Sequence, residues 1–229
     1  MSQSCAECDI RSNAIFCNLP QPALEQLERV RITAEYPKDA TLCMEGQDPR
    51  GVYIVCSGKV KLSATSKEGR SMILRMVDPG EVVGLTAALA GTPIEVTATT
   101  MEPSTISFVT RQEFLRLMQQ FPDSGMMVIN QLAHNYRSAY RELRSFGLSS
   151  GVAEKLARLL LEWLSAAPNP GKKPQFKLTI TQEEIAELIG TTRETVSRQL
   201  SDFKKRGLIR TDGCTVTVLN RAELERIVS

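Results

Sequence analysis

Residues 179–210, TITQEEIAELIGTTRETVSRQLSDFKKRGLIR, predict two short helices in tandem and decide the fold of the C-terminal part of the chain. Thr181 and Glu184 have the T-x-x-E spacing of a capping box, in which each side chain bonds a free backbone N–H at a helix start. Gly190 should end that helix, because glycine tolerates the left-handed C′ conformation. Thr191-Thr-Arg-Glu194 repeats the box and predicts a second helix. Its apolar positions recur every three or four residues: Val196, Leu200 and Phe203.

Two short helices joined by a tight turn form a helix-turn-helix, whose second helix enters the DNA major groove N-terminus first. The second helix here carries side chains that can bond bases, since arginine pairs with guanine, glutamate accepts from cytosine and serine suits several bases. Residues 192–210 also hold six Lys or Arg against two Asp or Glu, which suits a helix beside phosphates. The predicted DNA-binding residues are Arg193, Glu194, Ser197 and Arg198, with Thr181 and Thr192 at the helix starts.

The alternative is that Glu194 only caps the helix and that the arginines form a solvated face. The residues after the helix favour DNA binding instead. Gly213 and the alternating TVTVL at 215–219 predict a short hairpin, or wing, whose loop could contact the DNA backbone. The C-terminal part is therefore predicted to be a winged helix-turn-helix.

RETVSR at 193–198, with the wing behind it, resembles the recognition helix of the cAMP receptor protein and fumarate-nitrate reduction regulator (Crp/Fnr) superfamily of bacterial transcription factors. This resemblance implies a homodimer on a two-fold symmetric operator, with RNA polymerase as a partner. The E-x-x-S-R spacing of the oxygen-sensing branch falls on Glu194, Ser197 and Arg198. The R-E-x-x-x-R spacing of the cAMP branch falls on Arg193, Glu194 and Arg198. Since both fit, the resemblance implies half-sites with the shared TGA core.

Length and composition set further limits. The 229 residues suffice for two modest domains, and 42% hydrophobic with 24% charged residues is typical of soluble proteins. No apolar run approaches ~18 residues and no signal peptide is recognisable, so we expect a cytoplasmic protein that binds no membrane. The net charge of +2 is too small to indicate nucleic-acid binding by itself. No catalytic constellation is present, so we expect no enzyme.

Three of the six cysteines lie at the start of the chain. Cys5, Cys8 and Cys17 form a C-x2-C-x8-C pattern, and the first two are close enough to hold one metal ion or one iron of a cluster. These three are candidate ligands of a [4Fe–4S] cluster, which usually takes four protein ligands. The oxygen-sensing branch has its fourth cysteine late in the sensor domain, but the matching stretch here, Ser104–Phe108, contains none.

Three interpretations of the N-terminal cysteines stay open. They hold a cluster, they form a thiol redox switch or bind another metal, or they have no sensory role and their segment only packs on the sensor domain. Asp9 is a possible oxygen ligand in the first case. Cys43, Cys56 and Cys214 lie among apolar strand residues and are most simply small buried side chains, although the first two could also supply the missing ligand.

The region after a short predicted helix at 24–30 changes to strands separated by glycines. Apolar residues alternate in GVYIVCSGKVKLSAT at 51–65 and in RSMILRMV at 70–77, with turn signals about every 10 residues, as in a small antiparallel barrel or sandwich. This region resembles the double-stranded β-roll of cyclic-nucleotide-binding domains. The glycine turns that match are Gly46, Gly58 and Pro79-Gly80-Glu81.

A nucleotide-binding β-roll uses a glutamate for the ribose hydroxyl and an arginine for the phosphate. The resemblance aligns those positions with Leu85 and Glu95. Leucine cannot bond a hydroxyl and a carboxylate repels phosphate, so cAMP is not the expected effector unless Glu81, or an arginine elsewhere in the chain, restores the site. Haem, the other effector of the family, is not expected either, because His134 is the only histidine and has no recognisable partner ligand.

A short helix is predicted over 111–120 and a longer one over about 123–146. The longer helix has an apolar a/d stripe that favours dimerisation, with packing on its own β-roll as the alternative. The stripe consists of Ile129, Leu132, Tyr136, Ala139, Leu143 and Phe146. Residues 147–151 predict a flexible hinge. The next helix, 152–165, is expected to bury these residues: Leu156, Leu159, Leu160 and Trp163. A surface loop at 166–175 then leads to a strand at 176–180.

The predicted fold is α+β, with a β-roll, a long dimerisation helix and a winged helix-turn-helix. The predicted parts are a cysteine-bearing segment (1–18), the β-roll sensor (19–110), a helical region (111–147) and the DNA-binding domain (148–229). The predicted function is a homodimeric transcription regulator of the Crp/Fnr type, closer to the oxygen-sensing branch than to the cAMP branch. The alternative is a constitutive or other-ligand regulator with a vestigial nucleotide site and no cluster.

Overall fold

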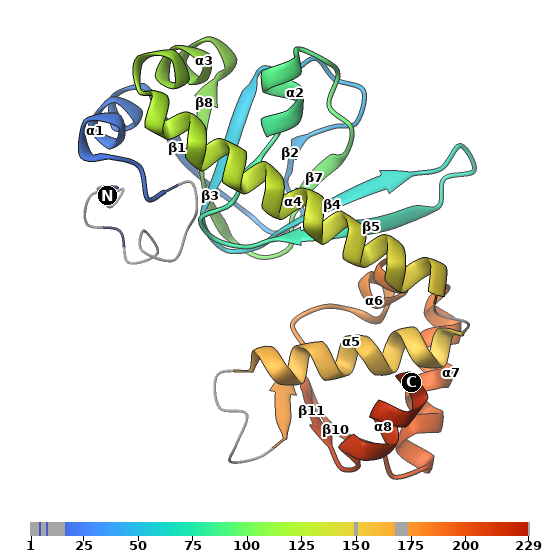
Figure 1. Ribbon diagram of the computed structural model, residues 1–229. Helices are drawn as coiled ribbons and strands as arrows, with labels where there is room; N and C mark the ends of the chain where they lie inside the picture. Colours follow the sequence, from blue (N-terminus) through green and yellow to red (C-terminus); the bar gives the residue numbers. More distant parts are fainter. Residues whose placement is uncertain (1–4, 6–7, 9–16, 149–150, 168–173, 229) are drawn as a thin grey trace. The chain divides into compact units, whose positions relative to one another are not determined.

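The computed structural model of the chain describes Cys5, Cys8 and residues 17–148, 151–167 and 174–228 (Figure 1). The chain divides into two compact units, residues 1–139 and 140–229, and each is described here by itself. The boundary falls inside the longest helix, so that one helix belongs to both units. None of the described helices is long and apolar enough to cross a membrane.

The first unit contains two antiparallel four-stranded sheets, which confirm the predicted β-roll. The strands of the first sheet, in spatial order, are β1 (Ile32–Tyr36), β8 (Ser104–Thr110), β3 (Gly51–Ser57) and β6 (Val82–Val83). The strands of the second are β2 (Thr41–Cys43), β7 (Thr97–Thr100), β4 (Val60–Thr65) and β5 (Ser71–Val77). Strand β3 pairs with β8 in a regular ladder until a bulge between Val55 and Ser57 breaks the register.

Four helices accompany these sheets, and α1, α3 and the start of α4 gather at one end of the β-roll (Figure 1). They are α1 (Gln21–Val30), α2 (Leu85–Ala90), α3 (Arg111–Gln120) and α4 (Pro122–Leu148). Side chains from α1, β3, β8, α3 and α4 form one apolar core, which we call the shared cluster because it joins the sheet to the long helix. Its buried members include Leu24, Leu27, Val52, Ile54, Val109, Phe114, Leu117 and Val128.

Helix α4 presents two different faces within the first unit. Val128 and Gln131 are buried against the β-roll, at 3% and 0% exposure. Ile129 and Tyr136 are 56% and 63% exposed, although both are large and apolar. Successive residues of a helix point about 100° apart, so a helix can bury residue 128 and leave residue 129 in solvent. The predicted stripe therefore does not pack on its own β-roll at these two positions.

The second unit confirms the predicted winged helix-turn-helix. Its elements are α5 (Val152–Ala166), β9 (Gln175–Lys177), α6 (Gln182–Ile189), α7 (Arg193–Lys205), β10 (Ile209–Asp212), β11 (Thr215–Val218) and α8 (Arg221–Val228). The three strands form one antiparallel sheet in the order β10-β11-β9. One core lies under both helices of the motif and the wing, and its fully buried members include Leu156, Leu160, Ile185, Val196 and Phe203.

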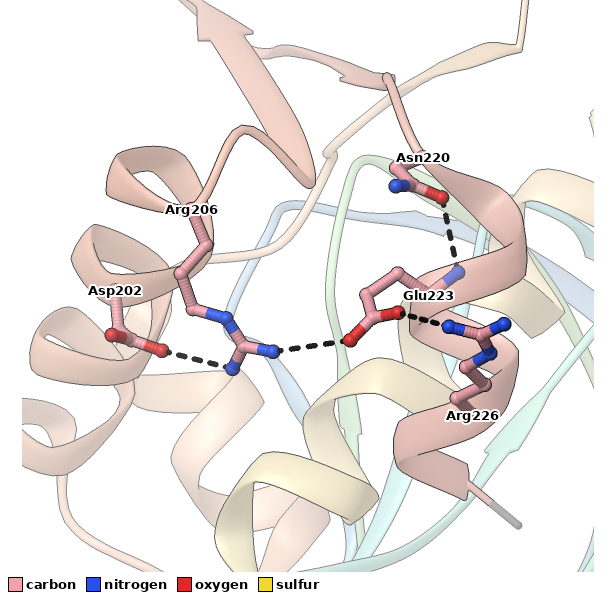
Figure 2. Close-up of polar contacts among 5 residues, drawn as sticks. All are labelled: Asp202, Arg206, Asn220, Glu223 and Arg226. Carbon is pink, nitrogen blue, oxygen red and sulfur yellow. Dashed lines mark hydrogen bonds and ion pairs between the residues drawn. The ribbon is translucent and has the colours of Figure 1, made fainter.

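Helix α8 is absent from the sequence predictions. Asn220 caps it, because the Asn220 side chain accepts the backbone N–H of Glu223 at 3.1 Å (Figure 2). The Glu223 carboxylate also pairs with Arg206 at the end of α7, at 3.6 Å, and Arg206 pairs in turn with Asp202 at 3.4 Å (Figure 2). Leu224 is fully buried in the core of the unit. Helix α8 therefore packs behind the motif and is tied to the C-terminal end of its second helix.

The first predicted capping box is confirmed and the second is wrong. Thr181 and Glu184 exchange hydrogen bonds at 2.7 and 3.1 Å, and Gly190 ends α6 with a φ of 66°. The cap of α7 is Thr192, which accepts the N–H of Thr195 at 3.3 Å. A box starting at Thr191 would need its backbone N–H, but that group already donates to the carbonyl of Ala186 at 2.9 Å in the C-terminal turn of α6.

Three smaller predictions need correction. The predicted hinge at 147–151 is partly helical, because α4 continues through Gly147 to Leu148. Ser149 and Ser150 lie outside the described residues, and Gly151 is the N-cap of α5. The strand expected at 176–180 ends at Lys177, because only residues 175–177 pair with β11. In α5, Leu164 is buried, whereas Leu159 and Trp163 are only half-buried at the edge of the core.

The position of the α7 cap can be tested by stability. Thr192→Ala should lower the free energy of unfolding of the second unit by about 1 kcal/mol, because it leaves an N-terminal backbone N–H unpaired. Thr191→Ala removes no helix cap and should stay within about 0.5 kcal/mol of the wild type. Trp163, the only tryptophan, packs on Phe176 with ring centroids 5.9 Å apart, so urea unfolding followed by its fluorescence reports on this unit. A larger effect at Thr191 would place the start of α7 one residue earlier.

Candidate DNA-binding face and cysteine cavity

The structure brings the four predicted base-reading residues together. Arg193, Glu194, Ser197 and Arg198 are all exposed on the first two turns of α7, while Val196 below them is buried. Together with two further residues they line a shallow surface hollow. The further residues are Gln182, the first residue of α6, and Ser201, one turn beyond Ser197. Sequence reasoning did not name these two, although the position of Gln182 directly after the Thr181 cap puts it beside the second helix start.

Glu194 is held in its charged form. Hydrogen bonds from its own backbone N–H and from the Thr192 side chain lower the pKa of the Glu194 carboxyl, with a smaller contribution from the charge of Arg193. A carboxylate can only accept hydrogen bonds, so Glu194 is suited to a donor such as the cytosine amino group. The exposed arginines next to it are donors only. This face of α7 therefore presents both hydrogen-bond acceptors and hydrogen-bond donors to the base edges of DNA.

The two threonines in the predicted DNA-binding set are both exposed helix caps. The Thr181 hydroxyl bonds Glu184 at 3.0 Å and accepts its backbone N–H, and the Thr192 hydroxyl is shared with Thr195 at 3.0 Å. Their hydroxyls are thus engaged in starting α6 and α7. Behind the motif, β10 and β11 form the predicted wing, with Gly213 in its turn at a φ of 52°.

Within the first unit, Cys5, Cys8 and Cys17 all line one cavity of about 370 Å³. The sequence left open whether these cysteines meet in space, and the structure brings them together. The remaining wall consists of residues from α1, β1, β3 and β8, chiefly Leu24, Leu27, Arg31, Thr33, Cys56 and Ser107. Cys56 is therefore a fourth cysteine of the same cavity. Its residue type was the only signal in the sequence that could have identified it.

Burial disfavours the thiolate form of two cysteines of the cavity, Cys17 and Cys5. Burial raises the pKa of the Cys17 thiol to about 12, with smaller contributions from Cys56, Cys5 and Cys8, and it also raises the pKa of Cys5. The guanidinium of Arg31 acts in the opposite direction on both thiols. A metal ligand must be a thiolate, so binding at this cavity would require the release of protons.

Arg31 is fixed at the edge of the cavity by several partners. Its guanidinium donates to the Ser107 hydroxyl at 3.1 Å and pairs with the Glu28 carboxylate at 3.7 Å. Glu28 in turn accepts the backbone N–H of Cys5. The first cysteine is thus attached to α1 through Glu28. Among the described residues, no three His, Cys, Asp or Glu side chains converge closely enough for a single metal ion, so the cysteines surround the cavity without meeting at one point.

Both units match known proteins. Residues 33–121 match the cyclic nucleotide-binding domain, and residues 154–227 match the Crp-like helix-turn-helix domain. The chain is 31% identical over 192 residues to the cyclic AMP receptor protein of Thermus thermophilus, covering 84% of this chain and 86% of that one. It belongs to the Crp/Fnr family. The relatives of this Crp/Fnr protein are transcription regulators, so it is a DNA-binding regulator and not an enzyme.

Members of different Crp/Fnr branches resemble the chain about equally. The transcriptional activator protein FnrL of Cereibacter sphaeroides is 28% identical over 216 residues, covering 91% of this chain and 85% of that one. The solved structure of FixK2 from Bradyrhizobium japonicum has a TM-score of 0.74 at 24% identity, over 87% of this chain and 98% of that one. That likeness bears on the fold alone. Overall similarity therefore does not assign the branch, and the signal has to be inferred from the residues themselves.

The residues at the family's nucleotide position have other roles in this Crp/Fnr protein. Leu85 is 2% exposed in the shared cluster, and Glu95 is exposed. Glu81, which could have restored the site, pairs with Arg75 at 2.7 Å and accepts from Gln131 of α4 at 3.3 Å. No described feature gathers these groups into a phosphate site. His134, the candidate haem ligand, is half-buried on α4.

The role of Arg198 can be tested on DNA with TGA half-sites. If Arg198 bonds a guanine edge as expected, Arg198→Ala should weaken binding by about 1–3 kcal/mol and relax specificity at that guanine. Arg221→Ala is the matched control: this arginine pairs with Glu225 on α8, outside the hollow, and its loss should leave affinity unchanged. Quantitative gel shifts on a set of half-sites with single changes measure both. Equal weakening on every sequence would make Arg198 a phosphate contact instead.

Proposed function

We propose that this protein is a homodimeric transcription regulator of the oxygen- or redox-responsive branch, which binds a palindromic site with TGA half-sites and holds an iron–sulfur cluster at its N-terminal cysteines. The observation that carries the sensory part is the cavity in the first unit that Cys5, Cys8 and Cys17 line together. The exposed face of α7 carries the DNA-binding part, since E-x-x-S-R is complete there and open to solvent.

The fit of a cluster to the cavity rests on donor type and enclosure. Iron–sulfur clusters are held by cysteine thiolates, and solvent exposure tunes their potentials. The cavity offers thiols, an apolar wall from Leu24, Leu27 and Ile54, and the positive charge of Arg31 near the thiolates that would form. When bound, an iron–sulfur cluster would supply a redox-active centre that oxygen and other oxidants can oxidise. The chain's own residues would hold it, exclude water from it and connect it to the long helix.

That connection is short. Cys5 and Cys17 pack against the shared cluster, which also contains Val128 of α4. A second link is polar: the Cys17 thiol lies 4.0 Å from the Gly80 carbonyl, and the next residue, Glu81, is bonded to Gln131 of α4. A change at the cysteines would thus alter how α4 packs on the β-roll. Because α4 continues into the second unit, its packing can bias the placement of the DNA-binding elements.

The exposed apolar face of α4 supports dimerisation through this helix. Met126, Ile129, Tyr136 and Tyr140 are each more than half exposed, which accounts for four of the eight large exposed apolar side chains of the described residues. Such a concentration on one helix marks a protein interface. A second copy of the same helix fits the a/d spacing, and two recognition helices must bind together to read a palindrome.

A constitutive regulator is the second candidate. It is favoured by the two positions where a nucleotide-binding β-roll has its glutamate and its arginine. Leu85 at the first is part of the core, and Glu95 at the second is a carboxylate, which repels a phosphate. In that case the cysteine cavity would be only a packing feature. The two candidates differ in whether bound iron, or the absence of oxygen, changes the affinity for DNA.

Dimerisation can be tested with a matched pair of isoleucines. Ile129→Asp places a charge in the proposed seam and should convert the dimer to a monomer, with a loss of affinity for the palindrome of at least about tenfold. Ile32→Asp changes an equally exposed isoleucine, at 66%, on β1 instead, and should remain dimeric. Analytical ultracentrifugation measures both. A monomeric wild type, or a dimeric Ile129→Asp protein, would contradict the proposed seam.

The sensory proposal is tested by purification without oxygen. We expect a brown protein with about four iron and four sulfide per chain, whose visible absorption bleaches in air together with a change in dimerisation or DNA affinity. Iron, acid-labile sulfide, the visible spectrum and gel shifts before and after air exposure provide the readouts. A colourless, metal-free protein that binds DNA equally in both conditions would establish the constitutive candidate.

A further inference from the structure

The cysteine cavity contains one cysteine more than the N-terminal pattern. Cys56 of β3 lines it beside Cys5, Cys8 and Cys17. Three of these residues precede α1 in the sequence, and the fourth comes from β3 of the first sheet.

We propose that Cys56 is the fourth protein ligand of the cluster, a role that rests on the proposed function above. The geometry of β3 supports this assignment. The ladder between β3 and β8 pairs Val55 with Ile106 and Ser57 with Thr105, so Cys56 is the extra residue of a β-bulge. A bulge turns a side chain out of the regular alternation and is over-represented beside functional sites. Here it leaves the Cys56 side chain half-buried and facing the cavity.

The positions of the other two cysteines, Cys43 and Cys214, exclude them as the fourth ligand. Cys43 is 3% exposed and belongs to the second apolar core of the β-roll, with Val55, Val60 and Val77. Cys214 is exposed at the tip of the wing in the second unit. Neither lines the cavity. Cys56 is thus the one cysteine outside the N-terminal pattern that the structure puts with Cys5, Cys8 and Cys17.

The strand that lacks the expected cysteine lies next to Cys56. Ser107 of β8 is fully buried, and its hydroxyl is 3.2 Å from the Cys56 thiol. The same hydroxyl is 2.7 Å from that of Thr33 and accepts from Arg31. On this assignment the fourth thiol comes from β3, the strand paired with β8, while the serine on β8 holds Arg31 and Thr33 in the cavity wall.

The charges of the cavity suit four thiolates. Each iron–thiolate bond forms as a Cys thiol loses its proton to solvent, with no change of oxidation state in the ligand. A cluster with four thiolates is anionic, so a positive neighbour stabilises it. The charged residues of the cavity wall are Arg31 and Glu35. Arg31, whose side chain is only 10% exposed, is held in this wall by the Ser107 hydroxyl and the Glu28 carboxylate.

The assignment is tested on full-length protein purified and desalted without oxygen. Cys56→Ala should lower bound iron and sulfide at least about tenfold, as should Cys17→Ala, because each variant removes one of the four proposed thiolate ligands. Cys43→Ala is the matched control, since it removes a buried cysteine of the same β-roll outside the cavity, and it should keep the wild-type content. Circular dichroism of the metal-free proteins verifies that each variant is folded.

The outcomes separate the two proposals. A wild type without iron and sulfide overturns the proposed sensory function and this assignment with it. A wild type that carries a cluster, next to a Cys56→Ala protein with the same content and spectrum, overturns the assignment alone. Loss in Cys56→Ala with retention in Cys43→Ala supports it.

A second measurement needs no substitution. Anaerobic alkylation of the wild type with iodoacetamide, mapped by mass spectrometry, compares the loaded protein with protein stripped by a chelator. Cys56 should be protected together with Cys5, Cys8 and Cys17 in the loaded form and become reactive after stripping, whereas the exposed Cys214 reacts in both. Equal labelling of Cys56 in the two forms overturns the assignment even if the Cys56→Ala protein fails to fold.

Discussion

The burial of the shared cluster is the constraint on which the first unit depends. Fully burying a leucine or valine side chain stabilises a fold by roughly 1.5–3 kcal/mol, and this cluster takes such side chains from α1, β3, β8, α3 and α4 at once. None of these elements can move without exposing apolar surface on the others. Helix α1 and β3, which also form the cavity wall, are therefore in the same packing unit as the long helix.

Because of this constraint, the two sides of α4 have different environments. Its inner side is held by Val128 and Gln131, and its outer side keeps large apolar side chains in water, which is unfavourable for an isolated chain. A soluble protein tolerates a continuous apolar stripe of this kind when a partner covers it. The proposed dimer seam and the proposed sensor contact thus lie on two faces of one helix, so a change in packing on one face would alter the position of the other.

Local spacing predicted much of the fold, and contacts between distant residues explain what it missed. The T-x-x-E box at Thr181 and the glycine after α6 are encoded within a few residues. The cap of α7 was placed one residue early, because the backbone N–H of Thr191 is used by the preceding helix. Helix α8 has its own local signal, Asn220 three residues before Glu223, directly after the second strand of the wing.

The candidate sites also differ in how far the sequence alone predicts them. Arg193, Glu194, Ser197 and Arg198 were predictable because helical periodicity alone puts them on one face. Cys56 was not, because its position depends on a bulge in the β3–β8 ladder and because the three cysteines that share its cavity are distant in the sequence. The alternation of the strand alone predicts a small buried side chain there, and only the tertiary structure distinguishes Cys56 from Cys43.

The polar contact between the β-roll and α4 explains why a small change near Cys17 could matter. Gln131 is fully buried, donates to both Glu81 and Asn135, and its own carbonyl oxygen has no partner among the described residues. Buried polar groups are costly when left unpaired, so this network permits few arrangements of α4 on the β-roll. Glu81 follows Gly80, whose carbonyl lies beside the Cys17 thiol. A shift of that turn would therefore strain or break the bond between Glu81 and Gln131, and with it the packing of α4 on the β-roll.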